Sequence, residues 1–137
     1  MIMVSACLTG ENCKYNGGNN KNEKVIEFLK GKEYIKICPE VMGSMTTPRP
    51  PSEIKGRKVI NSLGEDVTEF FLKGAYEALK LAKKYKASLI ILKAKSPSCG
   101  LGKIYDGSFS GNLTDGDGIT AKLLKENGFK VITENDL

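Results

Sequence analysis

Histidine is absent from this chain of 137 residues, and its four cysteines include no C-x-x-C pair. Without histidine the chain cannot form a Ser-His-Asp triad or a Cys-His catalytic pair. Without C-x-x-C it lacks the spacing of a zinc ribbon or of a thioredoxin-type redox pair. These absences exclude several common classes of enzyme and leave the thiols themselves as the unusual chemical feature of the sequence.

Long apolar runs are also missing, since none approaches the roughly 20 residues needed to cross a bilayer. The first apolar stretch, residues 2–6, has no basic segment before it and no A-x-A cleavage site after it. We therefore expect a first strand rather than a signal peptide, and a cytoplasmic protein in which structural disulfides are rare. A single domain covering residues 1–137 is expected, with enough chain to build its own core.

Aromatic residues make up only 7% of the chain, and no aromatic platform interleaved with arginine stands out. This disfavours a nucleic-acid-binding module that stacks bases on aromatic rings. The net charge is +5, and the positive charge is carried mostly by lysine. We interpret these lysines mainly as a solvated surface, with a modest attraction for anionic partners such as RNA.

The apolar residues that are present follow patterns typical of alternating strands and helices. We expect strands over residues 2–6, 34–37, 88–93 and 129–133, and helices over residues 22–30, 66–85 and 119–126. This order predicts an α/β fold, a Rossmann-like three-layer arrangement in which helices flank a mostly parallel sheet. In the longest helix, Asp66 and Glu69 resemble a capping box. Gly74 indicates close packing of that helix against the sheet.

Two further stretches lie outside this alternation. Residues 58–61 form a candidate edge strand. Residues 101–117 are glycine-rich and are predicted to be a long loop, which in a compact domain is usually functional or disordered. The part of this loop around Tyr105-Asp106-Gly107 is a candidate lid over a ligand site.

Three of the predicted strands lead into a cysteine, at Cys7, Cys38 and Cys99. Each cysteine is followed closely by turn residues. Parallel strands in an open α/β sheet end at one edge, and ligands bind in the crevice at that edge. Three thiols that are distant in the sequence are therefore expected to converge in space.

The chemistry of these thiols leaves several metal sites open. Thiolate ligation without histidine suits zinc, copper(I) or an iron–sulfur cluster. Four cysteines could close a structural zinc site, whereas three cysteines on a four-iron cubane would leave one iron with an exchangeable position. Taken singly, a cysteine at the end of a strand is as often a small buried hydrophobe.

Glu40 and Ser98 would lie beside any metal held by Cys38 and Cys99. A carboxylate in that place can act as a general acid or base, and a hydroxyl can orient substrate or water. The structural alternatives are a helix or turn cap for Glu40 and a turn hydroxyl for Ser98. Three prolines close to Arg49 predict a stiff, extended segment that holds this arginine in a fixed place, with an ordinary surface crossover as the alternative.

Separated blocks of the sequence resemble the thiouracil desulfurase family. These are VSACLTGENCKYNG at 4–17, CPEVMGSMTTPRPPSEI at 38–54, GEDVTEFFLKGA at 64–75, and SPSCG with IYDGSFSG between 96 and 111. The resemblance runs from residue 3 to the end of the chain, and it corresponds to the short, single-domain form of the family. Ser44 departs from the family pattern, in which a second glycine follows Gly43, and this departure could change the substrate pocket.

The resemblance implies a non-redox desulfurase with a [4Fe-4S] cluster held by Cys7, Cys38 and Cys99, with Cys13 in a supporting role. The open iron would bind the thiocarbonyl sulfur of a thiolated pyrimidine such as 2- or 4-thiouracil. Glu40 would activate water to attack the carbon, Ser98 would orient the substrate, and the sulfur would leave as hydrogen sulfide. The implied partner is a small thiolated base, with no membrane, and the protein would be a monomer or weak dimer.

Two alternatives stay open at this point. A sulfur-handling enzyme could run similar cluster chemistry on thiolated RNA, with tRNA as its partner. A protein without catalytic activity could instead use a zinc or cluster site for structure or for redox sensing.

Overall fold

Four parallel strands form the central sheet of the computed structural model, which describes all residues from 1 to 137. Their order across the sheet is β2-β1-β5-β8, and all three neighbouring pairs are parallel. The strands are β1 (Ile2–Ser5), β2 (Tyr34–Ile37), β5 (Leu89–Leu92) and β8 (Val131–Thr133). All of β1 and most of β5 are buried, as expected for central strands that are covered on both faces.

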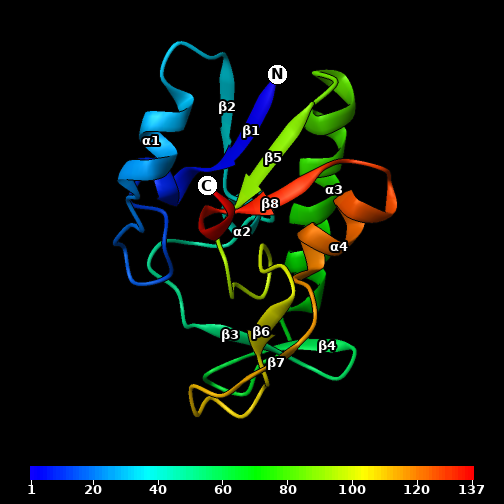
Figure 1. The fold of residues 1–137 in the computed structure, drawn as a ribbon. Coiled ribbons are helices and arrows are strands. Elements are labelled where there is room, and N and C mark those ends of the chain that lie inside the picture. The colour runs from blue at the N-terminus through cyan, green and yellow to red at the C-terminus, as the bar shows by residue number, and fades with distance from the viewer.

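Helices cover both faces of this sheet (Figure 1). On one face α1 (Glu23–Leu29) packs Val25 and Leu29 against Val4 and Ile91. On the other face α3 (Thr68–Lys84) and α4 (Ile119–Glu126) contribute apolar side chains to the larger core cluster. The predicted α/β class, with helices flanking a mostly parallel sheet, is confirmed. No helix has the length and apolarity needed to span a bilayer.

Two hairpins lie beyond the carboxyl ends of the sheet strands (Figure 1). One pairs β3 (Ser52–Lys55) with β4 (Lys58–Asn61), and the other pairs β6 (Lys103–Tyr105) with β7 (Leu113–Asp115). The candidate strand at residues 58–61 is therefore present, although it lies outside the main sheet. The prediction of a loop throughout residues 101–117 is wrong, because strands of three residues, one of them fully exposed, are too short to show alternation.

The start of α3 also differs from its prediction. Asp66 lies before the helix, where one of its carboxylate oxygens accepts hydrogen bonds from the backbone N–H and the hydroxyl of Thr68. The N-cap residue is Val67, which makes no side-chain capping hydrogen bond, so the capping box predicted for Asp66 and Glu69 is wrong. The Thr68 hydroxyl accepts a hydrogen bond from the Val59 N–H, and this cross-link to β4 sets the start of the helix instead.

Gly74 does mark a close approach, but not to the sheet. A Cβ atom built at Gly74 would lie 1.8 Å from the carbonyl oxygen of Pro39, and one at Gly43 would lie 2.1 Å from that of Phe70. The neighbour of α3 is therefore the short helix α2 (Pro39–Met42), whose backbone lies directly against it. Glycine at both positions lets α2 lie where it carries the residues after β2 into the site.

Candidate functional site

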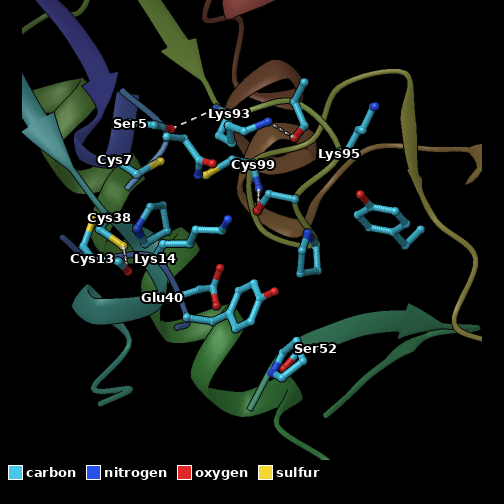
Figure 2. Close-up of a pocket in the computed structure, with 18 of the residues that line it drawn as sticks. Ser5, Cys7, Cys13, Lys14, Cys38, Glu40, Ser52, Lys93, Lys95 and Cys99 are labelled. Atoms are coloured by element: carbon cyan, nitrogen blue, oxygen red, sulfur yellow. Dashed lines mark hydrogen bonds between the residues drawn. The ribbon is translucent and has the colours of Figure 1, made fainter. Parts of the chain in front are cut away.

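A cavity of about 500 Å³ opens at the carboxyl ends of β1, β2 and β5. Its lining comes from the segments that follow these three strands, from β3, and from the β6–β7 hairpin (Figure 2). All four cysteines line it, and none forms a disulfide. The prediction that strand-end thiols converge at one edge of the sheet agrees with this geometry.

Short turns after the strands aim the thiols into the cavity. Cys7 lies in the 3-10 helix η1 (Ala6–Thr9) that directly follows β1, and Cys38 is the residue before the first turn of α2. Cys99 lies in a turn held by the Ser96 hydroxyl, which accepts hydrogen bonds from the N–H groups of Ser98 at 3.1 Å and Cys99 at 3.0 Å. Cys99 is buried.

Cys13 reaches the same cavity from the loop between η1 and α1. Hydrogen bonding with the Cys13 thiol lowers the pKa of Cys7, and it lowers the pKa of Cys38 to about 6. The same contacts raise the pKa of Cys13, and burial raises the pKa of Cys99. Two of the three strand-end thiols are therefore biased toward the thiolate form, which is the form that binds metals.

The donor set fits an iron–sulfur cluster. No three of the acidic and thiol side chains converge on one point, as the ligands of a single metal ion would. In a four-iron cubane each thiolate binds a different iron, so its ligands stand around a larger group. Cys7, Cys38 and Cys99 line a shared cavity from three separate strand ends, which suits that larger group better than a structural zinc ion.

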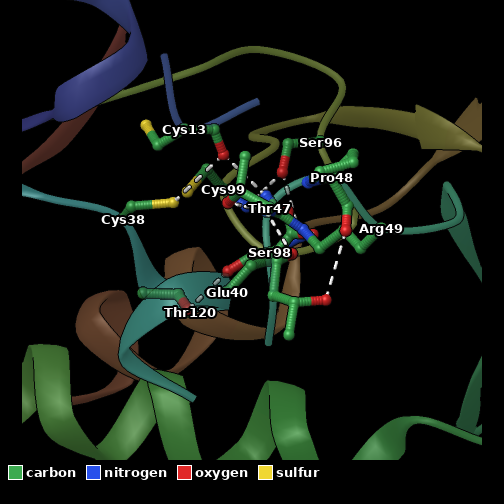
Figure 3. Close-up of polar contacts among 11 residues, drawn as sticks. Cys13, Cys38, Glu40, Thr47, Pro48, Arg49, Ser96, Ser98, Cys99 and Thr120 are labelled. Carbon is green, nitrogen blue, oxygen red and sulfur yellow. Dashed lines mark hydrogen bonds and ion pairs between the residues drawn. The ribbon is translucent and has the colours of Figure 1, made fainter. Parts of the chain in front are cut away.

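Glu40 lies in the first turn of α2 and lines the cavity beside the thiols. One of its carboxylate oxygens, Oε1, is 3.1 Å from Nε of Arg49. The Arg49 side chain is 4% exposed and that of Glu40 is 18% exposed, so this ion pair is largely shielded from solvent (Figure 3). The structure therefore brings together the predicted acid–base residue and the arginine of the proline-rich segment.

Ser98 is placed differently from its prediction. The residue is 1% exposed and does not line the cavity. The hydroxyl lies 2.8 Å from that of Thr120, and the Ser98 carbonyl accepts a hydrogen bond from the Thr120 N–H (Figure 3). In this position Ser98 ties the Cys99 turn to the start of α4, while Ser96 is the nearby serine that lines the cavity.

The β6–β7 hairpin supplies the wall of the cavity that faces away from the sheet, with Tyr105 and Phe109 among its lining residues. Glu53 of β3 holds it in place. Its Oε1 accepts hydrogen bonds from the N–H groups of Gly107 at 3.0 Å and Phe109 at 3.2 Å. Gly107 has a φ of +92°, and a Cβ there would lie 2.8 Å from the Ile54 carbonyl oxygen, so only glycine fits.

Several lining residues had no signal in the sequence. Lys14, Tyr15 and Lys93 line the cavity, and only folding brings them beside the thiols. Lys93 directly follows β5, and its ammonium group pairs with Glu134 at 2.9 Å. Ser44, in contrast, is exposed and outside the cavity, so its departure from the family pattern does not alter the pocket wall directly.

The fold and the site together define a class: an α/β protein with a thiol-lined cavity for a soft metal centre and a carboxylate beside the thiols. A family model described as 2-thiouracil desulfurase matches residues 2–136. The chain belongs to this family, which confirms the resemblance noted in the sequence.

Two relatives support this assignment. The uncharacterized protein YbbK of Bacillus subtilis (strain 168) is 46% identical over 147 residues of alignment, which covers 100% of this chain and 97% of YbbK. The solved structure of the [4Fe-4S]-dependent thiouracil desulfidase TudS is similar with a TM-score of 0.91 and 40% sequence identity. That match covers 99% of this chain and 91% of TudS.

Proposed function

We propose that this protein removes sulfur from thiolated pyrimidines such as 2- or 4-thiouracil without a redox step. The thiocarbonyl carbon exchanges sulfur for the oxygen of one water molecule, and the sulfur leaves as hydrogen sulfide. The carbon keeps its oxidation state, so no electron donor or acceptor is needed. The observation that carries the proposal is the meeting of Cys7, Cys38, Cys99 and Glu40 at one cavity in a member of this family.

The proposed cofactor is a [4Fe-4S] cluster held by Cys7, Cys38 and Cys99, in line with the name of the similar protein TudS. When bound with three thiolates, such a cluster supplies a thiophilic Lewis acid for the thiocarbonyl sulfur. Cys13 is assigned a supporting role, because its thiol contacts Cys7 and Cys38. Zinc as the resident metal is not part of the proposal.

Glu40 is proposed to act as general base toward water and then as general acid toward the departing sulfur. Its ion pair with Arg49 uses Oε1, and Oε2 makes no hydrogen bond within the chain. The aromatic residues Tyr15, Tyr105 and Phe109 line the cavity. A flat pyrimidine can pack against aromatic rings, and its packing excludes bulk water from the site.

Cysteine and Glu40 variants, reconstituted with iron and sulfide without oxygen, test the proposal. The wild type is expected to bind about four irons and four sulfides per chain and to release sulfide from thiouracil. Serine at Cys7, Cys38 or Cys99 abolishes cluster binding, whereas Cys13→Ser, the matched control, retains most of its iron. Glu40→Ala binds iron but releases sulfide only at a small residual rate. An iron-free Cys13→Ser protein, or a Glu40→Ala enzyme as fast as the wild type, overturns the assignment.

A free base, rather than thiolated RNA, is the proposed substrate. The cavity of about 500 Å³ is within the range typical of small-molecule sites and is enclosed by the β6–β7 hairpin. An assay of thiolated bases, nucleosides and tRNA side by side separates the two classes of substrate. The proposal further takes residues 1–137 as a single desulfurase domain, cytoplasmic and active as a monomer or weak dimer.

A further inference from the structure

We propose that Arg49 is the positioning residue of this site, and that it acts through Glu40. The proposal rests on the function proposed for Glu40 above. Arg49 donates no hydrogen bond to a strand-end thiol, and its task would be to hold the Glu40 carboxylate in one orientation at the cavity.

Three chain segments meet at the guanidinium group of Arg49 (Figure 3). Nε donates to Oε1 of Glu40 in α2 at 3.1 Å. Nη2 donates to the carbonyl oxygen of Cys13 at 2.8 Å. Nη1 donates within its own segment, to the Thr46 carbonyl at 3.2 Å and the Thr47 hydroxyl at 2.9 Å. Each of the three nitrogens therefore donates a hydrogen bond. Nε and Nη2 donate to other segments of the chain, and Nη1 donates within its own segment.

The backbone adds to this cross-link. The Arg49 N–H donates to the carbonyl oxygen of Tyr15 at 2.7 Å, which joins the loop that carries Cys13 to the proline-rich segment. Pro50 and Pro51 follow directly and restrict the chain there. The side chain that reaches Glu40 therefore starts from a backbone position that is itself held.

Because Arg49 is buried, its positive charge has to be balanced by a nearby negative group. The Arg49 side chain carries a positive charge and is 4% exposed, so it needs a negative partner nearby. Glu40 supplies that charge through Oε1, and the residue also lines the cavity. A lysine could replace the charge, but its single ammonium group cannot reach Glu40, Cys13 and Thr47 with the planar geometry that arginine provides.

A purely structural role for Arg49 and a role through Glu40 predict different effects on activity when Arg49 is removed. If Arg49 only holds loops together, its loss lowers activity equally whether or not Glu40 is present. If it acts by orienting Glu40, its loss has no further effect once Glu40 has been removed. A double-mutant cycle measures this difference directly.

The experiment compares cluster-loaded Arg49→Lys, Arg49→Ala, Glu40→Ala and the double variant Arg49→Ala/Glu40→Ala. Arg57→Lys is the matched control, because Arg57 is exposed in the β3–β4 turn and outside the cavity. Arg49→Lys is expected to keep its iron and its Tm, while kcat falls about 10- to 100-fold and KM changes by less than about twofold. Guanidinium ion in solution is expected to restore part of the activity of Arg49→Ala, but none in the double variant.

Four outcomes overturn the inference: wild-type kcat in Arg49→Lys, loss of iron from that variant, no rescue of Arg49→Ala by guanidinium, or a double variant slower than Glu40→Ala. Failure of the proposed function gives a different result. If Glu40→Ala itself releases sulfide at the wild-type rate, Glu40 is not the acid–base group, whatever Arg49 does. Rescue by guanidinium in the Arg49→Ala protein but not in the double variant supports the positioning role.

Discussion

The close contact between α2 and α3 provides the sharpest test of how the fold positions the site. Gly74→Ala adds one methyl group to α3 at the point where the helix faces α2. The new carbon would lie 1.8 Å from the carbonyl oxygen of Pro39 and 2.7 Å from the carbonyl carbon. Ordinary contact begins near 3.4 Å, so α2 has to move by more than about 1 Å.

Two opposing effects set the change in the free energy of unfolding. Alanine stabilises a helix interior by about 1 kcal/mol relative to glycine. Overpacking of a filled contact costs typically about 1–3 kcal/mol, and the obstructing atoms here are backbone that cannot rotate away. We expect the clash to win, with a net destabilisation of about 1–2 kcal/mol and a Tm lower by roughly 3–8 °C for a chain of this size.

Gly74→Ala should reduce the rate of sulfide release more strongly than it reduces the stability of the fold. Cys38 precedes the first turn of α2 and Glu40 lies within it, so a shift of α2 moves a thiol and the acid–base group together. A misplacement of about 1 Å can cost about 100-fold in rate. Thermal unfolding and sulfide release by the cluster-loaded variant measure the two effects separately.

Lys80→Ala is the control for this prediction, because Lys80 lies on the exposed side of the same helix in an ion pair with Glu77. Its loss should change stability by less than about 0.5 kcal/mol and leave the rate unchanged. A Gly74→Ala protein as stable and as active as the wild type would show that α2 is not held by this contact.

Three further predictions follow from other parts of the structure. Ser44 has a φ of 74°, so Ser44→Gly should stabilise the protein by about 1 kcal/mol without changing activity, and a lower Tm would contradict this. In cluster-free protein the pKa of Cys38 is about 6. Protonation below that pH removes the reactive thiolate, so iodoacetamide alkylation should rise through pH 6 and level off above it, while Cys99, whose pKa is raised by burial, stays unmodified. Mass spectrometry measures both sites, and a midpoint near the ordinary value of about 8.5 would refute the assignment. Glu53→Gln weakens the two hydrogen bonds that hold the hairpin, at a cost of about 1–3 kcal/mol, and should raise KM with unchanged iron content, because Phe109 then loses its fixed place; loss of iron instead would show that Glu53 supports the cluster.

Much of the fold could be predicted because it depends on local patterns. The apolar runs of β1 and β5 are continuous, and the amphipathic pattern of α3 is long enough to be unambiguous. Alternation of such segments leaves few arrangements other than a parallel sheet with helices on both faces. The β6–β7 hairpin could not be predicted in this way, because its strands of three residues carry almost no pattern. In the other hairpin β4 was predicted as a strand, but its partner β3 was not.

The roles of single side chains were harder to predict than the elements that carry them. Ser98 precedes a cavity-lining cysteine in the sequence, yet its hydroxyl turns toward Thr120 in α4. Gly74 marks a close approach, but the identity of the approaching segment is a property of the whole fold. Nothing in the sequence around Arg49 predicts its ion pair with Glu40, since the two residues meet only after β2, α2 and the proline-rich segment have packed.

The sequence by itself determined the α/β class and the meeting of three strand-end thiols. The hydrophobic pattern gives the order of strands and helices along the chain, and that alternation implies parallel strands that end at one edge of the sheet. Only the tertiary structure decided which groups face those thiols. The direction of a side chain depends on the turn that holds it and on what packs behind it, and those contacts join residues far apart in the chain. For this reason Glu40 and Arg49 lie together at the cavity, while Ser98 lies behind it.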